Sequence, residues 1–348
     1  MILSRALKSV ALLATVGMFA MSAQAAQATD DHDHPGPFAV NVPLSGDLHT
    51  HDPAILAGGH GRPWYVFSTG DPNVGGGSIQ IRSSKNGHDW SYQGTVWDAQ
   101  TEPDWVASAV PGVTNYWAPD ITEHDGTYYL YYAASTFGSN RSAIGLYTNT
   151  TLDPADPSHR WVDRGEVFAS HPGDMYNAID PGIVTDASGT PWMSYGSFWG
   201  GIYMIQLQWP SGTVAAGATP VHLADRHLPP NAIEGAYVYR HDGWYYLFVS
   251  LDFCCRATDS TYKTAVGRSR NVTGPYVDEQ GVPLLQGGSS VLLQSHSPMI
   301  GPGGPSVSKG YIAFHYYDAR LNGDFQLALR KLGWSPNGWP VMKTANGN

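Results

Sequence analysis

The chain has 348 residues, of which 42% are hydrophobic and 12% aromatic, and its formal net charge is −10 at pH 7. Charged residues make up only 14% of the sequence, which leaves no basic surface for a polyanion and argues against nucleic acid as a partner. The 40 glycines and 25 prolines, beside 20 tyrosines and 12 tryptophans, favour an all-β fold of short strands joined by tight turns.

Residues 1–25 have the features of an export signal. Arg5 and Lys8 precede an apolar run from Val10 to Ala20, and Ala23-Gln24-Ala25 forms a small-x-small cleavage pattern. The run is too short to cross a bilayer comfortably, and no other segment approaches about 20 apolar residues. We therefore expect a secreted or periplasmic protein with no membrane span.

Residues 26–40 are expected to form a flexible leader before a single domain at 41–348. The leader contains an Asp-Asp-His-Asp-His segment from Asp30 to His34, which could bind a metal ion but which we interpret as solvated.

The two cysteines, Cys254 and Cys255, are neighbours in the sequence. Neighbouring cysteines cannot connect distant segments. In an oxidising compartment they could form a vicinal disulfide ring that rigidifies a turn, or remain two buried thiols.

An internal repeat with a period of roughly 60 residues is the most informative feature, because such periods are typical of solenoids and propellers. Each copy opens with a Pro or Gly beside an apolar residue. The five openings are Asp52-Pro53-Ala54-Ile55, Ala118-Pro119-Asp120-Ile121, Asp180-Pro181-Gly182-Ile183, Glu234-Gly235-Ala236-Tyr237 and Ser297-Pro298-Met299-Ile300.

Each opening is followed by an aromatic strand and then by a third apolar strand. The aromatic strands begin near Trp64, Tyr128, Trp192, Trp244 and Tyr311, and the third strands near Ile79, Ala143, Ile202, Ala265 and Leu327. A fourth segment follows at Trp90, Trp161, Pro275 and Trp339, and is less clear in the third copy. Four short strands in each of five copies predict a five-bladed β-propeller with four-stranded antiparallel blades.

The first strand of each propeller blade lines the central channel, so equivalent residues of the openings should converge on the axis. Those residues are Asp52, Ala118, Asp180, Glu234 and Ser297. An isolated Asp-Pro is commonly a solvated turn. Three carboxylates crowded in one channel repel each other and raise at least one pKa, which is typical of a functional site.

Glycoside hydrolysis requires two carboxyl groups, one protonated for the leaving oxygen and one ionised to activate water or attack directly. Glu234 follows the apolar residues Ala232 and Ile233, which favours the role of proton donor. Asp52 lies beside histidines, which favours the ionised form and the role of base. Asp180 would then raise the pKa of the acid.

Several motifs are similar to those of the arabinanases of glycoside hydrolase family 43. They are HDPAI around Asp52, NYWAPDI from Asn115, YNAIDPGI around Asp180, SYGSFWGGI from Ser194, IEGAYVYR around Glu234 and FHYYD from Phe314 to Asp318. The resemblance extends over nearly the whole mature chain, and it implies a five-bladed, inverting enzyme that cleaves α-1,5-linked arabinan in an internal or terminal mode.

The resemblance also implies roles for individual residues. It assigns Asp52 as base, Glu234 as acid and Asp180 as modulator. It further implies that Trp117, Asn177 and Ser197 contact the sugar chain, although Trp117 could equally be a core aromatic.

One segment departs from the family pattern. Members often carry a Gly-Pro-Gly-His segment whose histidine helps to hold a metal ion, usually calcium, through waters in the channel, whereas this chain has Gly301-Pro302-Gly303-Gly304. His296 or His315 could substitute, so a calcium ion in the channel is the cofactor that the resemblance implies.

Two alternatives remain at this point. One is an arabinofuranosidase or β-xylosidase of the same family, which would take terminal sugars. The other is a non-catalytic sugar-binding propeller, in which the carboxylates only form hydrogen bonds with hydroxyl groups.

Overall fold

The structure is a computed structural model that describes residues 43–59 and 61–342. The predicted export signal, the leader and the proposed domain start at residue 41 lie outside these ranges. In the described ranges, helices are all too short or too polar to cross a membrane.

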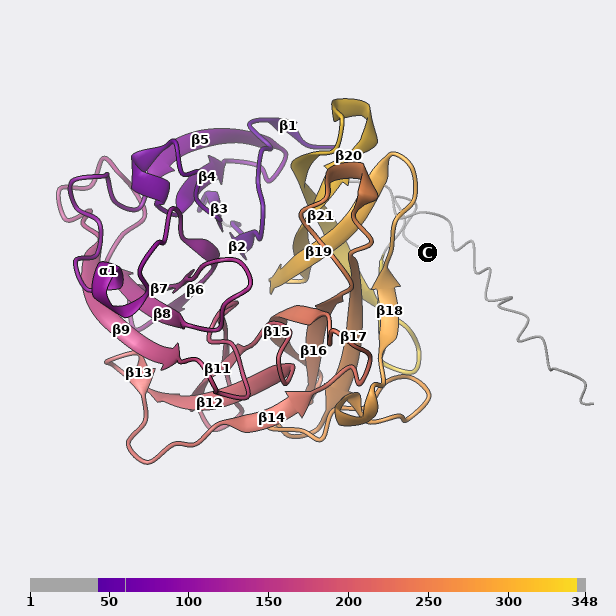
Figure 1. The fold of residues 1–348 in the computed structure, drawn as a ribbon. Coiled ribbons are helices and arrows are strands. Elements are labelled where there is room, and N and C mark those ends of the chain that lie inside the picture. The colour runs from indigo at the N-terminus through magenta and orange to yellow at the C-terminus, as the bar shows by residue number, and fades with distance from the viewer. Residues whose placement is uncertain (1–42, 60, 343–348) are drawn as a thin grey trace, which may run out of the picture. The chain divides into compact units, whose positions relative to one another are not determined.

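The described residues form five sheets arranged in a ring (Figure 1), with consecutive strands of each blade antiparallel, and this confirms the predicted five-bladed propeller. Blade 1 contains β2 (Ala54–Leu56), β3 (Trp64–Ser68), β4 (Gln80–Ser84) and β5 (Asp89–Thr95). Blade 2 contains β6 (Trp117–His124), β7 (Thr127–Ala134), β8 (Ser142–Asn149) and β9 (Val162–Ser170). Blade 3 contains β10 (Gly182–Thr185), β11 (Pro191–Tyr195), β12 (Ile202–Gln208), β13 (Thr213–Val214) and β14 (Val221–Ala224).

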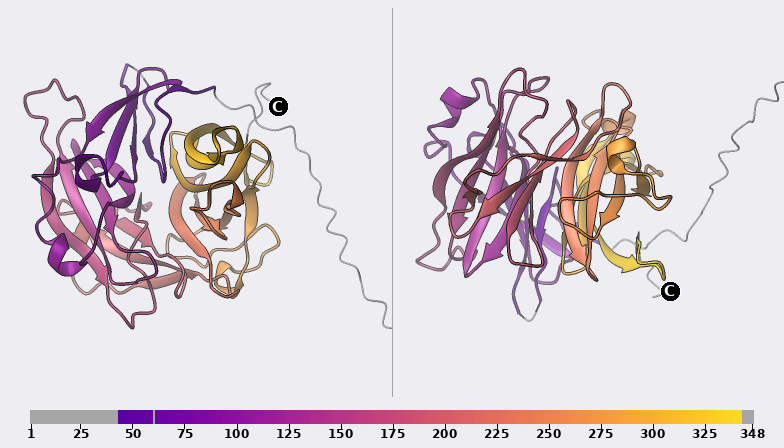
Figure 2. Two further views of the ribbon diagram at one scale, coloured as in Figure 1. Left: turned by 45° about the horizontal axis from the view of Figure 1, so that its top comes forward. Right: turned by 90° about the horizontal axis from the view of Figure 1, so that it is seen from below.

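Blade 4 contains β15 (Ile233–His241), β16 (Trp244–Leu251), β17 (Lys263–Ser269) and β18 (Ser290–Leu293). Blade 5 contains β19 (Met299–Ser308), β20 (Tyr311–Asp318), β21 (Asp324–Trp334) and β22 (Pro340–Met342). Short helical turns in the connections are η1 (Gly75–Gly77), α1 (Val106–Ala109), η2 (Ala257–Asp259), η3 (Leu284–Gln286) and η4 (Ala319–Leu321). Figure 2 shows the blades and these connections in two further views.

The outer edges of the blades are less regular than the repeat predicts. In blade 1 an additional strand, β1 (Ser45–Gly46), pairs in parallel with β5. In blade 3 both β13 and β14 pair with β12. In blade 4 the predicted segment at Pro275 is not a strand, because Val277 forms only isolated bridges and β18 takes the outer position.

Blades 1 and 5 meet through a packed core and through side-chain hydrogen bonds, which closes the ring. Ser306 Oγ accepts a hydrogen bond from the Ile55 amide at 3.1 Å and donates one to the Pro53 carbonyl at 2.5 Å. The Leu327 amide donates to the Leu48 carbonyl at 2.8 Å. Blades 1 and 5 are therefore joined beside β2, the inner strand that follows Asp52.

In blades 4 and 5 the residue at the channel-facing position is not the residue that the repeat predicts. Asp52 and Asp180 both have left-handed backbone, with φ of 51° and 56°. The strand pairing places Ala118, Gly235 and Gly304 at the equivalent position, and these residues also have positive φ. The prediction that Ser297 occupies this position in blade 5 is wrong. Gly304 occupies it, seven residues later, because β19 begins with a bulged extension.

Glu234 therefore lies one residue before the position that Asp52 and Asp180 occupy. A bulge in β15 between Glu234 and Tyr237 makes room for this offset. Because successive side chains of a strand point to opposite sides, the Glu234 side chain enters the channel from a different direction than those of Asp52 and Asp180.

Candidate active site

A cavity with a volume of about 1300 Å³ is lined by Asp52, Asp180 and Glu234. They come from blades 1, 3 and 4. The predicted convergence of three carboxylates from separate blades is therefore present, even though Glu234 stands one residue out of register.

Asp52 is held by donors from several directions. Thr69 Oγ1 donates to Asp52 Oδ2 at 2.7 Å, and His51 Nδ1 lies 2.8 Å from the same oxygen. The Asp52 amide donates to His315 Nδ1 at 3.1 Å. Burial by itself raises the pKa of Asp52, but the interactions with His51, His315 and Thr69 outweigh it and keep the pKa well below the ordinary value. Asp52 is therefore ionised, as a base must be.

Asp180 and Glu234 behave in the opposite way. Burial raises the pKa of Asp180 well above its ordinary value, and the charges of Glu234 and Asp52 raise it further. Burial also raises the pKa of Glu234, although hydrogen bonds with Ser197 and Tyr262 moderate the rise. The amide of Gly235 donates to Asp180 Oδ2 at 2.9 Å. Both buried carboxyl groups therefore favour their protonated forms more than exposed carboxyl groups do.

The three residues expected to contact sugar all line the same cavity. Trp117 packs against Phe137 with ring centroids 4.9 Å apart, and Phe137 is 84% exposed. Ser142 donates a hydrogen bond to Asn177 Oδ1 at 2.7 Å. Ser197 donates to Glu234 Oε2 at 2.6 Å, so its hydroxyl is engaged with the predicted acid.

Some cavity residues were not identified from the sequence. Thr69 contacts Asp52, Tyr262 contacts Glu234, and the aromatic rings of Phe137 and Phe253 line the cavity from blades 2 and 4. Thr69 directly follows the aromatic strand of blade 1, a position that could have identified it. Nothing in the local sequence marks Phe137 or Phe253.

The model of glycosyl hydrolases family 43 matches residues 41–340. The chain belongs to this family. A relative from Cellvibrio japonicus, described as an extracellular exo-α-(1→5)-L-arabinofuranosidase, is 40% identical over 309 residues, which cover 84% of this chain and 86% of the relative. A relative from Bacillus subtilis, described as an extracellular endo-α-(1→5)-L-arabinanase, is 38% identical over 292 residues, which cover 83% and 86%.

Solved structures of family 43 are similar as well. The endo-arabinanase from Bacillus licheniformis has a TM-score of 0.79 and 38% identity, with 86% of this chain and 99% of that chain covered. A Cellvibrio cellulosa α-L-arabinanase in complex with arabinohexaose has a TM-score of 0.77 and 39% identity, with 86% and 96% covered. The resemblance inferred from the motifs is confirmed, and the chain is a glycosidase of family 43.

The histidines do not fit a directly bound calcium ion in this family 43 channel. His296 is exposed and is not among the residues that line the cavity. His315 lies in the channel, 3.5 Å from Asp52 Oδ1, and is fully buried. Its Nδ1 accepts the Asp52 amide, and burial keeps its pKa well below the ordinary value, so the proton is on Nε2.

A protonated ring nitrogen cannot ligate a metal ion. His315 Nε2 has no hydrogen-bond partner in the described part of the chain, but it points a hydrogen, not a lone pair, at its surroundings. Calcium also prefers oxygen ligands, and the cluster of His51, Asp52 and His315 offers one carboxylate. We derive no catalytic step through a metal ion.

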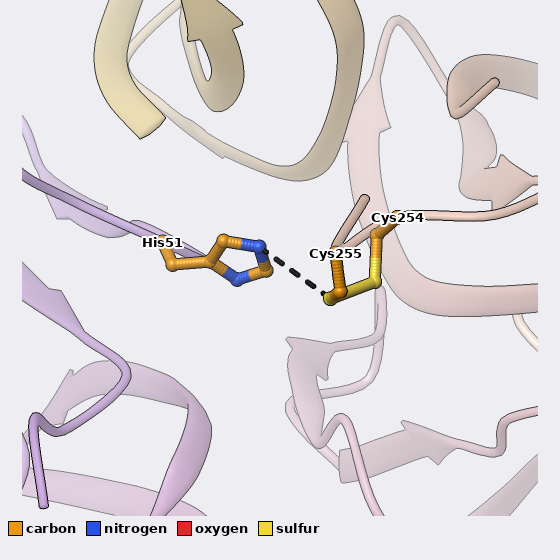
Figure 3. Close-up of side chains that lie close together, drawn as sticks. All are labelled: His51, Cys254 and Cys255. Atoms are coloured by element: carbon orange, nitrogen blue, oxygen red, sulfur yellow. Dashed lines mark hydrogen bonds between the residues drawn. A yellow bond between two sulfur atoms is a disulfide. The ribbon is translucent and has the colours of Figure 1, made fainter. Parts of the chain in front are cut away.

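Cys254 and Cys255 form a vicinal disulfide, which decides between the two alternatives left by the sequence. Both cysteines line the cavity. Figure 3 shows the disulfide facing the ring of His51, whose Nε2 lies 3.9 Å from Cys255 Sγ.

Proposed function

We propose that this family 43 enzyme hydrolyses α-1,5-linked arabinan with inversion, with Asp52 as base, Glu234 as acid and Asp180 as modulator of the acid. The contrast in protonation carries the proposal. Asp52 is surrounded by donors and ionised, whereas burial raises the pKa values of Asp180 and Glu234 in the same cavity.

This contrast supports a single-displacement mechanism. Asp52 would accept a proton from a water molecule as that water attacks the anomeric carbon. Glu234 would donate its proton to the O5 oxygen of the leaving sugar on the other side of the bond. Inverting enzymes use an acid and a base in this way. After the reaction Asp52 carries the proton and Glu234 is ionised, and exchange with solvent restores both.

Each neighbour of the two catalytic residues has a separate task in this scheme. Thr69 and His51 keep the lone pairs of Asp52 directed into the cavity. Ser197 orients the Glu234 carboxyl group through a hydrogen bond to Oε2. The charge of Glu234 raises the pKa of Asp180, and by the same repulsion an ionised Asp180 would disfavour ionisation of the acid.

The comparisons support the substrate and the compartment. The relatives from Cellvibrio japonicus and Bacillus subtilis are described as extracellular enzymes acting on α-(1→5)-L-arabinofuranosyl linkages. The cavity with aromatic rings from blades 2 and 4 suits a neutral sugar chain. We extend both properties to this chain, which would act outside the cytoplasm.

Asp52→Asn and Glu234→Gln test the assignment without changing side-chain size. We expect each variant to lower kcat on linear arabinan by about 10²–10⁴-fold, because general acid and general base steps contribute that much. Asp125→Asn is the matched control, since Asp125 is 92% exposed at a turn of blade 2 and its replacement should leave kcat unchanged. Near-normal turnover in either active-site variant would contradict the proposal.

A further inference from the structure

The vicinal disulfide is connected to the proposed base by a continuous chain of hydrogen bonds. The amide of Cys255 lies 2.7 Å from Tyr317 Oη, which lies 2.8 Å from His51 Nε2. His51 Nδ1 in turn lies 2.8 Å from Asp52 Oδ2. The chain runs from the loop after β16, through β20 of blade 5, to the segment that precedes β2.

The two ends of this chain determine the direction of its first and last hydrogen bonds. A backbone amide can only donate, so Cys255 donates to Tyr317 Oη. An ionised carboxylate can only accept, so His51 Nδ1 carries the proton and donates to Asp52. His51 Nε2 is paired with the Tyr317 hydroxyl at the other end of the ring. The Cys255 amide thereby holds the Tyr317 hydroxyl at the place where it contacts His51, and His51 in turn directs its Nδ1 proton at the base.

The ring of the vicinal disulfide explains how that amide stays in place. Cys255 has a φ of 64°, a conformation that residues with a Cβ rarely adopt. Closure of the ring through the two sulfur atoms restrains the Cys254–Cys255 peptide in this conformation. Without the ring the backbone is free to relax toward negative φ, which would move the amide away from Tyr317.

The orientation of the His51 ring depends on this chain of hydrogen bonds as well as on the neighbouring rings. Its ring stacks on His315 with centroids 3.7 Å apart, and the edge of Phe325 contacts it at 5.1 Å. These contacts restrict the plane of the ring. They do not determine which nitrogen carries the proton, because only the partners of Nδ1 and Nε2 do that.

We propose that the Cys254–Cys255 disulfide is a positioning element for the catalytic base, acting through Tyr317 and His51. The inference deepens the proposed function and rests on the assignment of Asp52 as base. Thr69 donates to the carboxylate independently of this chain. Loss of the disulfide therefore weakens catalysis without abolishing it.

Reduction of the folded, full-length enzyme tests the proposal, because Cys255 is exposed and accessible to a reagent. A dithiol reagent donates two electrons and two protons, giving two thiols and the reagent's own cyclic disulfide. We expect kcat on linear arabinan to fall about tenfold on reduction, with KM changed less than twofold, and to recover on reoxidation.

A double-mutant cycle shows whether the effect passes through Tyr317. Tyr317→Phe removes the connecting hydroxyl, so we expect it to lower kcat about tenfold and to make the enzyme insensitive to reduction. Tyr316→Phe is the matched control on the same strand, because its hydroxyl faces Asp318 and lies outside the cavity. It should retain normal kcat and the full response to reduction.

Several outcomes would overturn the proposal. An equal loss on reduction in wild type and Tyr317→Phe would show that the disulfide acts by another route. A higher KM with unchanged kcat would assign the disulfide to sugar binding. Unchanged kinetics on reduction, verified by thiol titration, would also refute it. Thermal unfolding of the reduced enzyme establishes that it is folded at the assay temperature, and Cys254→Ser with Cys255→Ser provides a second comparison.

Failure of this inference is distinguishable from failure of the proposed function. If Asp52→Asn is inactive while reduction leaves kcat unchanged, only the role of the disulfide is wrong. If Asp52→Asn retains normal turnover, the base has been misassigned, whatever reduction does.

Discussion

Gly304 shows how a single missing side chain shapes the site. It occupies the channel position that Asp52 and Asp180 occupy in their own blades, with a φ of 61°. A Cβ atom on it would lie 2.9 Å from Asp52 Oδ1 and 3.0 Å from His315 Nδ1. The family histidine would not fit at this position without displacing the base or His315. The absence of a side chain therefore allows Asp52 and His315 to pack together.

Gly304→Ala should lower activity more than its backbone strain explains. We expect kcat to fall about 10-fold to 100-fold, because small displacements of a catalytic group have effects of this size. Gly310→Ala is the matched control: its φ is 77°, and a Cβ atom added there would meet no other atom within 4 Å. Both variants carry a similar strain of about 1–2 kcal/mol. Equal kcat values in the two variants, measured with their melting temperatures, would contradict this account.

The sequence identified the three carboxylates of the site but not most of the residues that contact them. Asp52, Asp180 and Glu234 could be found because the repeat brought equivalent openings to one axis. Tyr262 could not, since it contacts a carboxylate of another strand and the pairing is visible only in three dimensions. His315 was identified as a candidate metal ligand, whereas its Nδ1 accepts the Asp52 amide.

Among the strands, β6 contains a buried acid outside the proposed mechanism. Asp120 is 3% exposed and its Oδ2 accepts a hydrogen bond from the Ile183 amide at 2.6 Å, which joins blades 2 and 3. Burial raises the pKa of Asp120 from 3.8 to about 7, although the amides of Ile183 and Ile121 act against the rise. The folded protein thus retains a proton that the unfolded chain has lost at mildly acidic pH.

Proton binding at Asp120 makes the stability of the fold depend on pH. Between pH 3.8 and about 7 the folded state binds more protons at Asp120 than the unfolded state, so stability falls as pH rises through this window. Asp120→Asn keeps an acceptor for Ile183 and removes the titration. We expect its melting temperature to equal that of wild type near the acid end and to exceed it by a few degrees above the window. A wild type that remains more stable throughout the series would contradict this expectation.

The strands were largely predictable and their register was not. Pairs of aromatic and apolar runs predicted the second and third strands of every blade, because alternation and β-propensity are local properties. The openings of blades 4 and 5 were misaligned by bulges in β15 and β19, which change the register without a local sequence signal. β18 was missed because a long connection separates it from β17.

The ring of blades is closed by contacts between blade 1 and blade 5. The hydroxyl of Ser306 satisfies both the amide of Ile55 and the carbonyl of Pro53, the residue next to Asp52. Ser308 forms a single bond, from the Ala57 amide to its Oγ, at 3.1 Å. Closure of the ring therefore takes place directly beside the proposed base.

Ser306→Ala should destabilise the fold by about 1–3 kcal/mol, because it leaves a buried donor and a buried acceptor without their partner. Ser308→Ala should have a smaller effect, since it removes one hydrogen bond at a partly buried site. Urea unfolding of both variants measures the difference. Equal stability of the Ser306→Ala variant and wild type would show that closure depends on the apolar core alone.

The stereochemistry of the first product tests the central claim most directly. An ionised Asp52 that activates water, opposite a protonated Glu234, makes one displacement at the anomeric carbon. Proton NMR of linear arabinan during the first minutes of hydrolysis should therefore show the β-anomer at the newly formed reducing ends, before mutarotation. Initial release of the α-anomer would mean retention through a covalent intermediate, and it would contradict the roles assigned to Asp52 and Glu234.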